Sequence, residues 1–146
     1  MNEISKLIDV LANYASEKKI DFIPGTSPVP VSGKVFGATE IRFGIESILE
    51  FWLTAGRFCE SFESELKNFL GCRAVLLCNS GSSANLLAIS ALTNRQTQNY
   101  LKAGDEVITA AVGFPTTVGP IIQNGLVPVF IDVSLGNYNI LSDRIL

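Results

Sequence analysis

A turn rich in serine and glycine, between an apolar segment and an apolar helix, is the strongest chemical signal in the sequence. It reads "CNSGSSANLLA" and spans Cys78–Ala88, with a helix expected from about Ser83. The first N–H groups of such a helix have no partner inside it and face an incoming anion, with the positive end of the helix dipole behind them. Gly81 lets a phosphate approach the backbone closely. Hydroxyl donors can be added by Ser80, Ser82 and Ser83.

The same turn has a simpler interpretation. Serine is a common N-cap, so an ordinary strand-to-helix turn capped by serine explains the residues equally well. The segment lacks the Gly-Lys-Ser/Thr ending of a Walker loop and does not contain Gly-x-Gly-x-x-Gly. The residues alone leave both interpretations open.

A second signal, "AAVGFPTT" (Ala110–Thr117), follows an expected strand at 106–111. Ligands of open α/β sheets bind outside the carboxyl ends of the strands, so Phe114 would lie beside the phosphate turn. Its ring could stack there on a planar heteroaromatic ring. The alternative is a loop phenylalanine folded into the core. Thr116 and Thr117 are expected as helix caps.

A third signal is Arg57 in "WLTAGRF", where Gly56-Arg57 separates two expected helices. Arg57 can meet an anionic substrate, or it can be a solvated arginine at a helix end. The spacing favours the solvated arginine. Asp132, at the end of an expected strand, is interpreted as a strand-end cap.

The carboxyl-terminal half must position these residues through alternating strands and helices. We expect strands at 74–78, 106–111 and 127–133 and helices at 83–92 and 116–124. Nearly continuous apolar strands separated by helices indicate a parallel sheet covered on both faces. The chirality rule then gives two right-handed βαβ units in series. The predicted fold class is α/β with a parallel βαβαβ core, and helix 83–92, apolar nearly all round, should be buried.

The amino-terminal half is expected to be helical and extended. Helical spacing predicts a first helix at 2–16 and a second that is capped by Thr39 and runs through Trp52. A third helix is expected at 59–70, with Gly71 as its C-cap. Between the first two, prolines and glycines in 21–37 require an irregular extended segment. We favour an arm held on a partner over a disordered linker, because apolar residues there need burial: Phe22, Ile23, Val29, Val31, Val35 and Phe36. The domain division is 1–38 for the arm and 39–146 for the first part of a larger domain.

Composition excludes several classes of function. A net charge of −3 and a pI near 4.9 argue against a nucleic-acid partner. No signal peptide or membrane-length apolar run is evident, so we expect a cytoplasmic protein without a membrane partner. Three cysteines without Cys-x-x-Cys spacing favour reduced thiols over a metal site. The absence of histidine excludes Ser-His-Asp and Cys-His catalysis within the chain.

Taken together, these blocks resemble the DegT/StrS-type sugar aminotransferases, a family of fold-type I pyridoxal-phosphate enzymes, from about Gly25 to Ile140. The phosphate turn of that family is matched by "NSGSSANLLAISAL", and its next two strands by "LKAGDEVITAAVGFPTTVGPIIQNGLVPVFIDV". Its Gly-…-Phe-Glu-…-Leu-Gly pattern is present as Gly56, Phe62, Glu63, Leu70 and Gly71. The resemblance implies part of the large domain of such an enzyme.

Within the family, "SGKVFGA", "WLTAGRF" and "GFPTTV" are most similar to the dehydratase branch, CDP-4-keto-6-deoxyglucose 3-dehydratase. Ordinary sugar aminotransferases more often have Gly-Pro at Gly56-Arg57 and Phe-x-Ala-Thr at Gly113–Thr116. The resemblance implies pyridoxal or pyridoxamine phosphate as cofactor, held at its phosphate by Gly81 and Ser82 and stacked on Phe114. It also implies a nucleotide-linked 4-keto-6-deoxy sugar as substrate.

The remaining site residues of the family lie beyond the matched region. They are the aspartate at the pyridine nitrogen, a lysine (histidine in the dehydratase branch) and the cysteines of an iron–sulfur cluster. We therefore expect a fragment that is inactive alone, without catalytic or metal-binding residues of its own, from a homodimeric parent with a possible reductase partner. The parent would be a 3-dehydratase of deoxysugar or lipopolysaccharide O-antigen biosynthesis. The alternatives are a sugar aminotransferase and a non-catalytic binding or assembly remnant.

Overall fold

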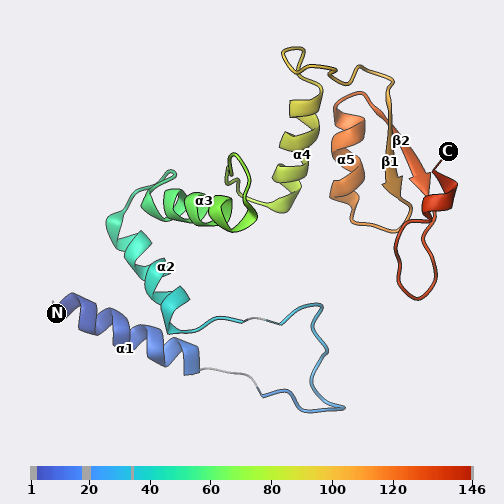
Figure 1. The fold of residues 1–146 in the computed structure, drawn as a ribbon. Coiled ribbons are helices and arrows are strands. Elements are labelled where there is room, and N and C mark those ends of the chain that lie inside the picture. Colours follow the sequence, from blue (N-terminus) through green and yellow to red (C-terminus); the bar gives the residue numbers. More distant parts are fainter. Residues whose placement is uncertain (1–2, 18–20, 34, 146) are drawn as a thin grey trace. The chain divides into compact units, whose positions relative to one another are not determined.

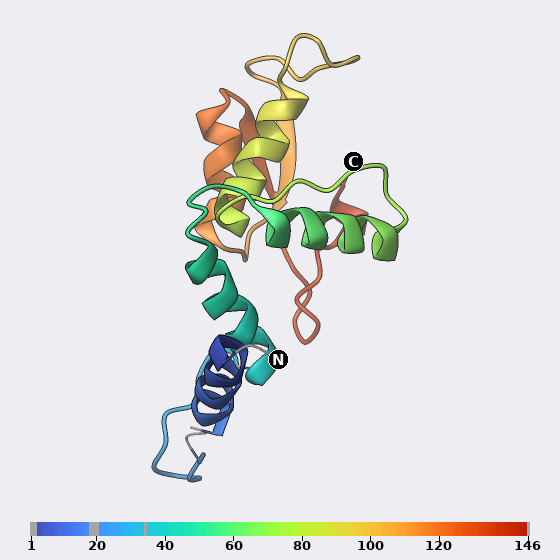
Figure 2. The same ribbon diagram turned by 90° about the vertical axis from the view of Figure 1, so that its left-hand side faces the viewer.

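The structure is a computed structural model that describes residues 3–17, 21–33 and 35–145. The chain forms two compact units, residues 1–75 and 76–146, and each is described by itself. Figure 1 and Figure 2 show the helices and strands of both units.

The first unit is built on two packed helices, α1 (Glu3–Glu17) and α2 (Ala38–Glu50). Ile8 and Ala12 of α1 are buried. Arg42 of α2 adds an ion pair to Asp9 of α1 at 3.1 Å. The predicted first helix is confirmed where the structure describes it, while its expected first residue, Asn2, lies outside the described residues.

Helix α2 begins and ends differently from its prediction. Its N-cap is Gly37, whose N–H donates to Glu40 Oε2 at 2.6 Å, so the prediction that Thr39 caps it is wrong. The reason is that Glu40 reaches back to the residue three positions before it, as in a capping box. The helix ends at Glu50, because Phe51 adopts a left-handed conformation (φ 50°), and Trp52 follows in the connecting loop.

Helix α3 (Arg57–Leu70) starts two residues earlier than predicted and ends as predicted. Gly71 has φ 63° and its N–H donates to Asn68 O at 3.3 Å, while Cys72 N–H donates to Lys67 O at 3.2 Å. These bonds satisfy carbonyl groups of the last turn, and the positive φ favours glycine.

The segment between α1 and α2 is irregular, as predicted, in the residues described there. Its apolar side chains, however, are not buried: Val31 and Val35 are fully exposed, and Phe22 and Ile23 are more than half exposed. These side chains are not covered within the chain, and the expectation that a partner covers them stays a prediction. Pro24, Pro28 and Pro30 interrupt the segment, because proline donates no backbone hydrogen bond to a helix or a strand ladder.

The second unit carries α4 (Gly81–Leu92), β1 (Glu106–Ala110), α5 (Pro115–Gln123), β2 (Val127–Ile131) and the short 3-10 helix η1 (Ser142–Arg144). Strands β1 and β2 are parallel, with Ile108 opposite Val129. Ile121, Leu126 and Thr109 form the buried centre of this unit. The parallel strands joined through α5 confirm the α/β class.

The expected strand at 74–78 does not form. The sheet of the described residues has two strands, β1 and β2, and 74–78 is extended without strand pairing. A strand needs a neighbouring backbone for its hydrogen-bond ladder. Among the described residues, β1 and β2 pair only with each other, so segment 74–78 has no such neighbour.

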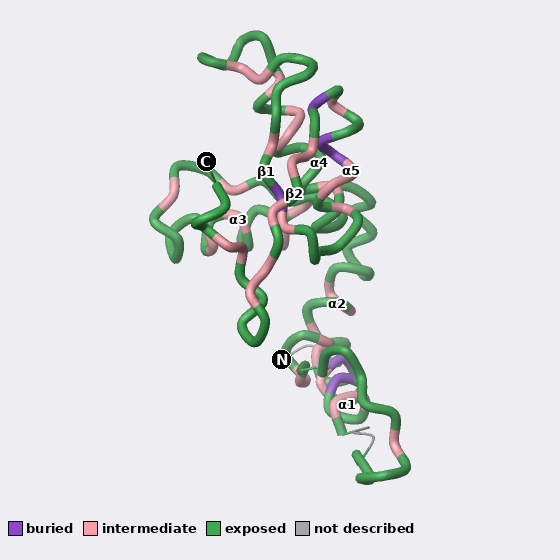
Figure 3. The backbone as a smooth tube through the Cα atoms, turned by 90° about the vertical axis from the view of Figure 1, so that its right-hand side faces the viewer, coloured by how far each residue is buried: buried purple, intermediate pink, exposed green. Residues whose placement is uncertain are grey.

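The prediction that α4 is buried is also wrong. Helix α4 contacts α5, but it contains no buried residue, and Leu87 is 60% exposed. Figure 3 shows how few buried positions the second unit contains. A single neighbouring helix covers only part of the surface of a helix that is apolar nearly all round.

Candidate functional site

The amino terminus of α4 is capped by serine, as the interpretation of an ordinary capped turn predicts, and the anion-binding interpretation stays a prediction. Ser80 is the N-cap, and its Oγ accepts a hydrogen bond from Ser83 N–H at 3.2 Å. Ala84 N–H donates to Ser80 O at 3.0 Å, which starts the helix. The N–H groups of Gly81 and Ser82 precede that bond and have no acceptor among the described residues. Two backbone donors thus remain available at the positive end of the helix dipole.

Gly81 leaves the backbone open at this point. A Cβ atom built there would have no neighbouring atom within 4 Å. Glycine is therefore not required here by packing within the chain or by a positive φ. The open backbone and the two donors fit a phosphate group, because phosphate binding needs close approach to N–H groups.

Phe114 lies at the N-cap of α5, directly after the loop that follows β1. Its side chain is 70% exposed, so the structure does not support the alternative that folds it into the core. Pro115 occupies the first helical position, where its missing N–H costs nothing. Thr116 and Thr117 follow inside the first turn, so the prediction that they cap the helix is wrong.

The phosphate turn and Phe114 come to the same end of the second unit. Helices α4 and α5 lie side by side and run in the same direction, and both begin where β1 ends (Figure 1). Asn85 Nδ2 in α4 donates to Thr116 O in α5 at 3.3 Å, which links their first turns. Sequence reasoning missed Asn85. Pro120 could have indicated it, because proline has no N–H to donate to the carbonyl of Thr116, four residues earlier, and so leaves that carbonyl available to a side chain.

A second polar contact joins the far ends of the two helices. Asn124 Oδ1 accepts hydrogen bonds from Ser90 Oγ and Thr93 Oγ1, each at 3.2 Å. Asn124 Nδ2 donates to Pro120 O at 2.8 Å. The helices are thus joined by side chains near both ends, which limits sliding of one along the other.

Arg57 belongs to the first unit, where its side chain is 55% exposed at the start of α3, in agreement with the favoured interpretation of a solvated arginine at a helix end. It is also paired with two carboxylates. Its Nε donates to Glu50 Oε1, its Nη2 donates to Glu46 Oε2 at 3.2 Å, and its guanidinium lies 4.0 Å from the ring centre of Phe58. Hydrogen bonds to Glu50 and Glu46 raise the pKa of Arg57. Hydrogen bonds from Arg42 and then Arg57 lower the pKa of Glu46. Arg57 therefore stabilises the junction of α2 with α3.

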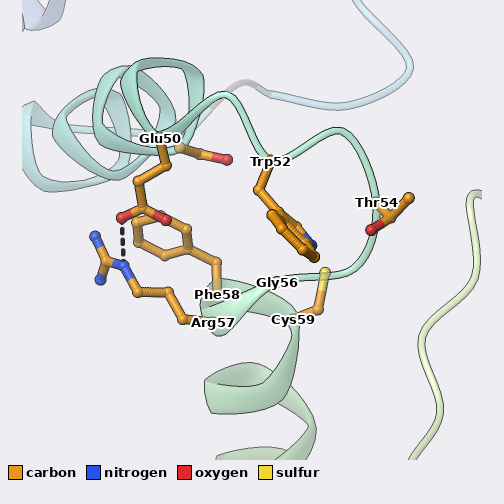
Figure 4. A pocket seen from close by; sticks show the side chains of 8 residues that line it. Glu50, Trp52, Thr54, Gly56, Arg57, Phe58 and Cys59 are labelled. Atoms are coloured by element: carbon orange, nitrogen blue, oxygen red, sulfur yellow. Dashed lines mark hydrogen bonds and ion pairs between the residues drawn. The ribbon is translucent and has the colours of Figure 1, made fainter.

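A wide, open pocket of about 650 Å³ borders Arg57 and includes Phe43, Phe58 and Phe62. A second pocket beside Arg57 is small. It encloses about 50 Å³, and Figure 4 shows its lining, which includes Trp52, Thr54, Gly56 and Cys59. With the arginine paired to carboxylates, this pocket offers no free cation to a substrate. We assign it no ligand.

Other predicted features are placed as follows. Asp132 directly follows β2, and its Oδ1 accepts from Val133 N–H at 2.8 Å, as expected for a strand-end cap. Cys59, Cys72 and Cys78 are free thiols.

Within the described ranges, no three side chains of His, Cys, Asp or Glu gather in a metal-binding arrangement. No helix in the described part of the chain is long and apolar enough to span a membrane.

Comparison with known proteins gives consistent matches. The model of the DegT/DnrJ/EryC1/StrS aminotransferase family matches residues 38–146. The lipopolysaccharide biosynthesis protein RfbH of Salmonella typhimurium is 55% identical over 139 residues, covering 94% of this chain and 32% of the relative. The dTDP-4-dehydro-2,6-dideoxy-D-glucose 3-dehydratase of Saccharopolyspora spinosa is 48% identical, covering 95% of this chain and 30% of the relative.

A solved structure agrees with these matches. The GDP-4-keto-6-deoxy-D-mannose-3-dehydratase of E. coli with bound hydrated PLP aligns with a TM-score of 0.67 at 34% identity. The alignment covers 76% of this chain and 28% of that one. The chain thus spans about a third of the length of the curated relatives it matches.

Proposed function

The chain belongs to the DegT/DnrJ/EryC1/StrS aminotransferase family, and we propose that it forms the amino-terminal part of a cofactor-binding domain. The cofactor is pyridoxal or pyridoxamine phosphate, and the complete enzyme acts on a nucleotide-linked sugar. The single observation that carries the proposal is the meeting of two features at one end of the second unit. These are the open amino terminus of α4 at Gly81 and the exposed ring of Phe114.

The residues present have distinct roles in this proposal. The N–H groups of Gly81 and Ser82 donate to the cofactor phosphate, and the Ser82 hydroxyl adds a further donor. Phe114 contacts the face of the pyridine ring and shields it from water. When bound, the cofactor supplies an electron-withdrawing ring next to the sugar carbons that react. We assign no proton-transfer residue to this chain.

For the complete enzyme we propose 3-dehydration of a nucleotide-linked 4-keto-6-deoxy sugar, in deoxysugar or lipopolysaccharide biosynthesis. Two relatives named as 3-dehydratases support this choice. The Gly56-Arg57 and "GFPTT" blocks support it as well. The family name keeps a sugar aminotransferase as the second candidate. A non-catalytic remnant is the third.

Further parts of the proposal concern the complete enzyme. We propose a cytoplasmic homodimer whose iron–sulfur cluster, with ligands outside this chain, receives electrons from a reductase partner. Neither nucleic acid nor a membrane is among the proposed partners. The domain division proposed from the sequence, 1–38 and 39–146, stays part of this proposal.

The test uses the complete translation product that contains this sequence. We expect it to bind pyridoxamine phosphate and to dehydrate a nucleotide-linked 4-keto-6-deoxy sugar, while the 146-residue chain alone shows no turnover. We expect histidine at the position of the aminotransferase lysine, because histidine can transfer protons without bonding covalently to the cofactor. A lysine there, no cysteine cluster and transamination activity would assign an aminotransferase instead. Absence of any cofactor binding would leave the non-catalytic remnant.

A further inference from the structure

A proline inside α5 leaves one backbone carbonyl without its helical partner. In an α-helix, the carbonyl of residue 116 accepts from the N–H of residue 120. Residue 120 is Pro120, which has no N–H and whose ring crowds the carbonyl four residues before it. Thr116 O is therefore available to a donor outside its own helix, either water or a side chain, since the position is partly exposed.

Asn85 supplies that donor from the neighbouring helix. Its Nδ2 donates to Thr116 O at 3.3 Å. Asparagine is a poor helix former in a helix interior. Asn85 lies at the fifth residue of α4, so the local preference of the helix does not explain it. The contact with the carbonyl released by Pro120 gives Asn85 a specific role.

Resting on the proposed function, we propose that Asn85 is a positioning residue that sets the spacing between the phosphate-binding turn and the stacking ring. Asn85 is one helical turn after Gly81, and Thr116 is two residues after Phe114. The hydrogen bond therefore joins the helical turn that directly follows the phosphate-binding residues to the first turn of α5, which begins beside the stacking ring. A rigid cofactor that contacts both turns requires a fixed spacing, whereas a ligand that contacts one turn does not.

The contact of Asn124 with Ser90 and Thr93 provides an internal comparison. It joins the same two helices at the ends remote from Gly81 and Phe114. Loss of this contact should loosen the helix pair without directly changing the spacing at the amino termini. Ser90→Ala is therefore the matched control for Asn85→Ala, since each removes one polar link between α4 and α5.

The test compares two ligands on the complete translation product. Pyridoxamine phosphate would contact both turns, and inorganic phosphate would contact only the α4 turn. We expect Asn85→Ala to weaken pyridoxamine phosphate binding about three- to tenfold, the effect of losing one hydrogen bond. Phosphate affinity should change by less than about twofold, because the donors of Gly81 and Ser82 remain. Ser90→Ala should lower the melting temperature and leave the ratio of the two affinities unchanged.

A double-mutant cycle with Pro120→Ala identifies the cause. Alanine at position 120 restores an N–H for Thr116 O, so Asn85→Ala should then lose most of its effect on pyridoxamine phosphate affinity. An equal loss in both backgrounds, or an equal loss of phosphate affinity, would overturn the positioning role. So would unchanged pyridoxamine phosphate affinity in Asn85→Ala when the wild type binds it. Failure of the wild type itself to bind pyridoxamine phosphate is a different result: it refutes the proposed function, and the positioning role with it.

Discussion

The indole ring of Trp52 lies directly against Gly56. A Cβ atom at position 56 would be 2.9 Å from Trp52 Cδ1. The indole is held there by a hydrogen bond from Trp52 Nε1 to Ala55 O at 2.9 Å. The loop between α2 and α3 is thus folded onto the residue that caps α3.

We expect Gly56→Ala to destabilise the first unit by about 0.5–1 kcal/mol, because the added methyl group must displace the indole of Trp52, which is 65% exposed and can shift outward. Urea unfolding monitored by Trp fluorescence measures this, since Trp52 is the only tryptophan. Gly44→Ala in α2 is the control: a Cβ there meets nothing within 4 Å. It should be neutral or stabilising by up to about 1 kcal/mol. Equal stability of Gly56→Ala and wild type would contradict the contact.

Periodicity and turn residues predicted most of the local structure. Helices α1 and α3, the Gly71 cap, and the β1–α5–β2 sequence follow from patterns within about fifteen residues, where local preferences dominate. The predicted strand at 74–78 does not form, and its absence could not be predicted in the same way, because a strand depends on a backbone partner that is often distant in sequence. The prediction that α4 is buried was wrong for a related reason, since the burial of a helix depends on the other helices and strands that pack around it.

The candidate site was predictable in its residue types and less so in its contacts. Gly81, Ser82 and Phe114 lie at helix starts, as predicted, because helix starts carry local signals, while their role in binding a cofactor stays a prediction. Arg57 was correctly interpreted as an exposed arginine at a helix end, but its ion pairs were not predicted, because Glu46 and Glu50 lie on the preceding helix and only the loop geometry brings them to Arg57. Asn85 was missed because its acceptor, Thr116 O, lies on another helix and is left without a helical donor by Pro120.

Acid should weaken the first unit through Glu46. Hydrogen bonds from Arg42 and Arg57 lower its pKa in the folded state from the ordinary value of 4.5. The stability that this carboxylate contributes is therefore present above pH 4.5 and is lost as the pH falls below it. We expect Glu46→Gln to lower the melting temperature at pH 7 and to reduce its further decrease on acidification.

The control for Glu46 is Glu106→Gln, which removes a carboxylate from the other unit. Glu106 takes part in no ion pair in the described part of the chain. High salt should shrink the difference between Glu46→Gln and wild type, because exposed pairs are screened. An identical pH dependence of melting in both variants would contradict a role for the Glu46 pairs.

Gly81 should matter for the ligand and not for the fold. We expect Gly81→Val to weaken pyridoxamine phosphate binding to the complete protein about ten- to a hundredfold, because a branched side chain blocks approach to charge-assisted donors. Ser82→Ala should do less, since the backbone donors remain. The melting temperature of the apo form should change little in either variant, because a Cβ at 81 meets no neighbour. Fluorescence titration of apo protein measures the affinities, and unchanged affinity in Gly81→Val would refute the phosphate site.

Phe114 tests the other half of the site. We expect Phe114→Ala to lose about 0.5–1.5 kcal/mol of cofactor binding beyond the effect of lost area, and Phe114→Tyr to be tolerated. The ring is 70% exposed, so neither change should lower the melting temperature of the apo protein appreciably. If Phe114→Ala lowers the melting temperature but leaves cofactor affinity intact, the ring stabilises the core and does not stack on the cofactor.

The apolar surface of the 146-residue chain should make it self-associate. Val31 and Val35 are fully exposed, and Leu76 and Phe69 are more than four-fifths exposed. Apolar surface left in water favours association, and the two-stranded sheet adds open strand edges to it. We expect the isolated chain to bind an apolar dye and to form oligomers in light scattering as its concentration rises.

The double substitution Val31→Lys and Val35→Lys should lower dye binding, because charged side chains interrupt the exposed apolar segment. Replacing Val31 with isoleucine should leave dye binding unchanged or raise it. A wild-type chain that stays monomeric and binds no dye would show that these side chains are covered within the chain itself.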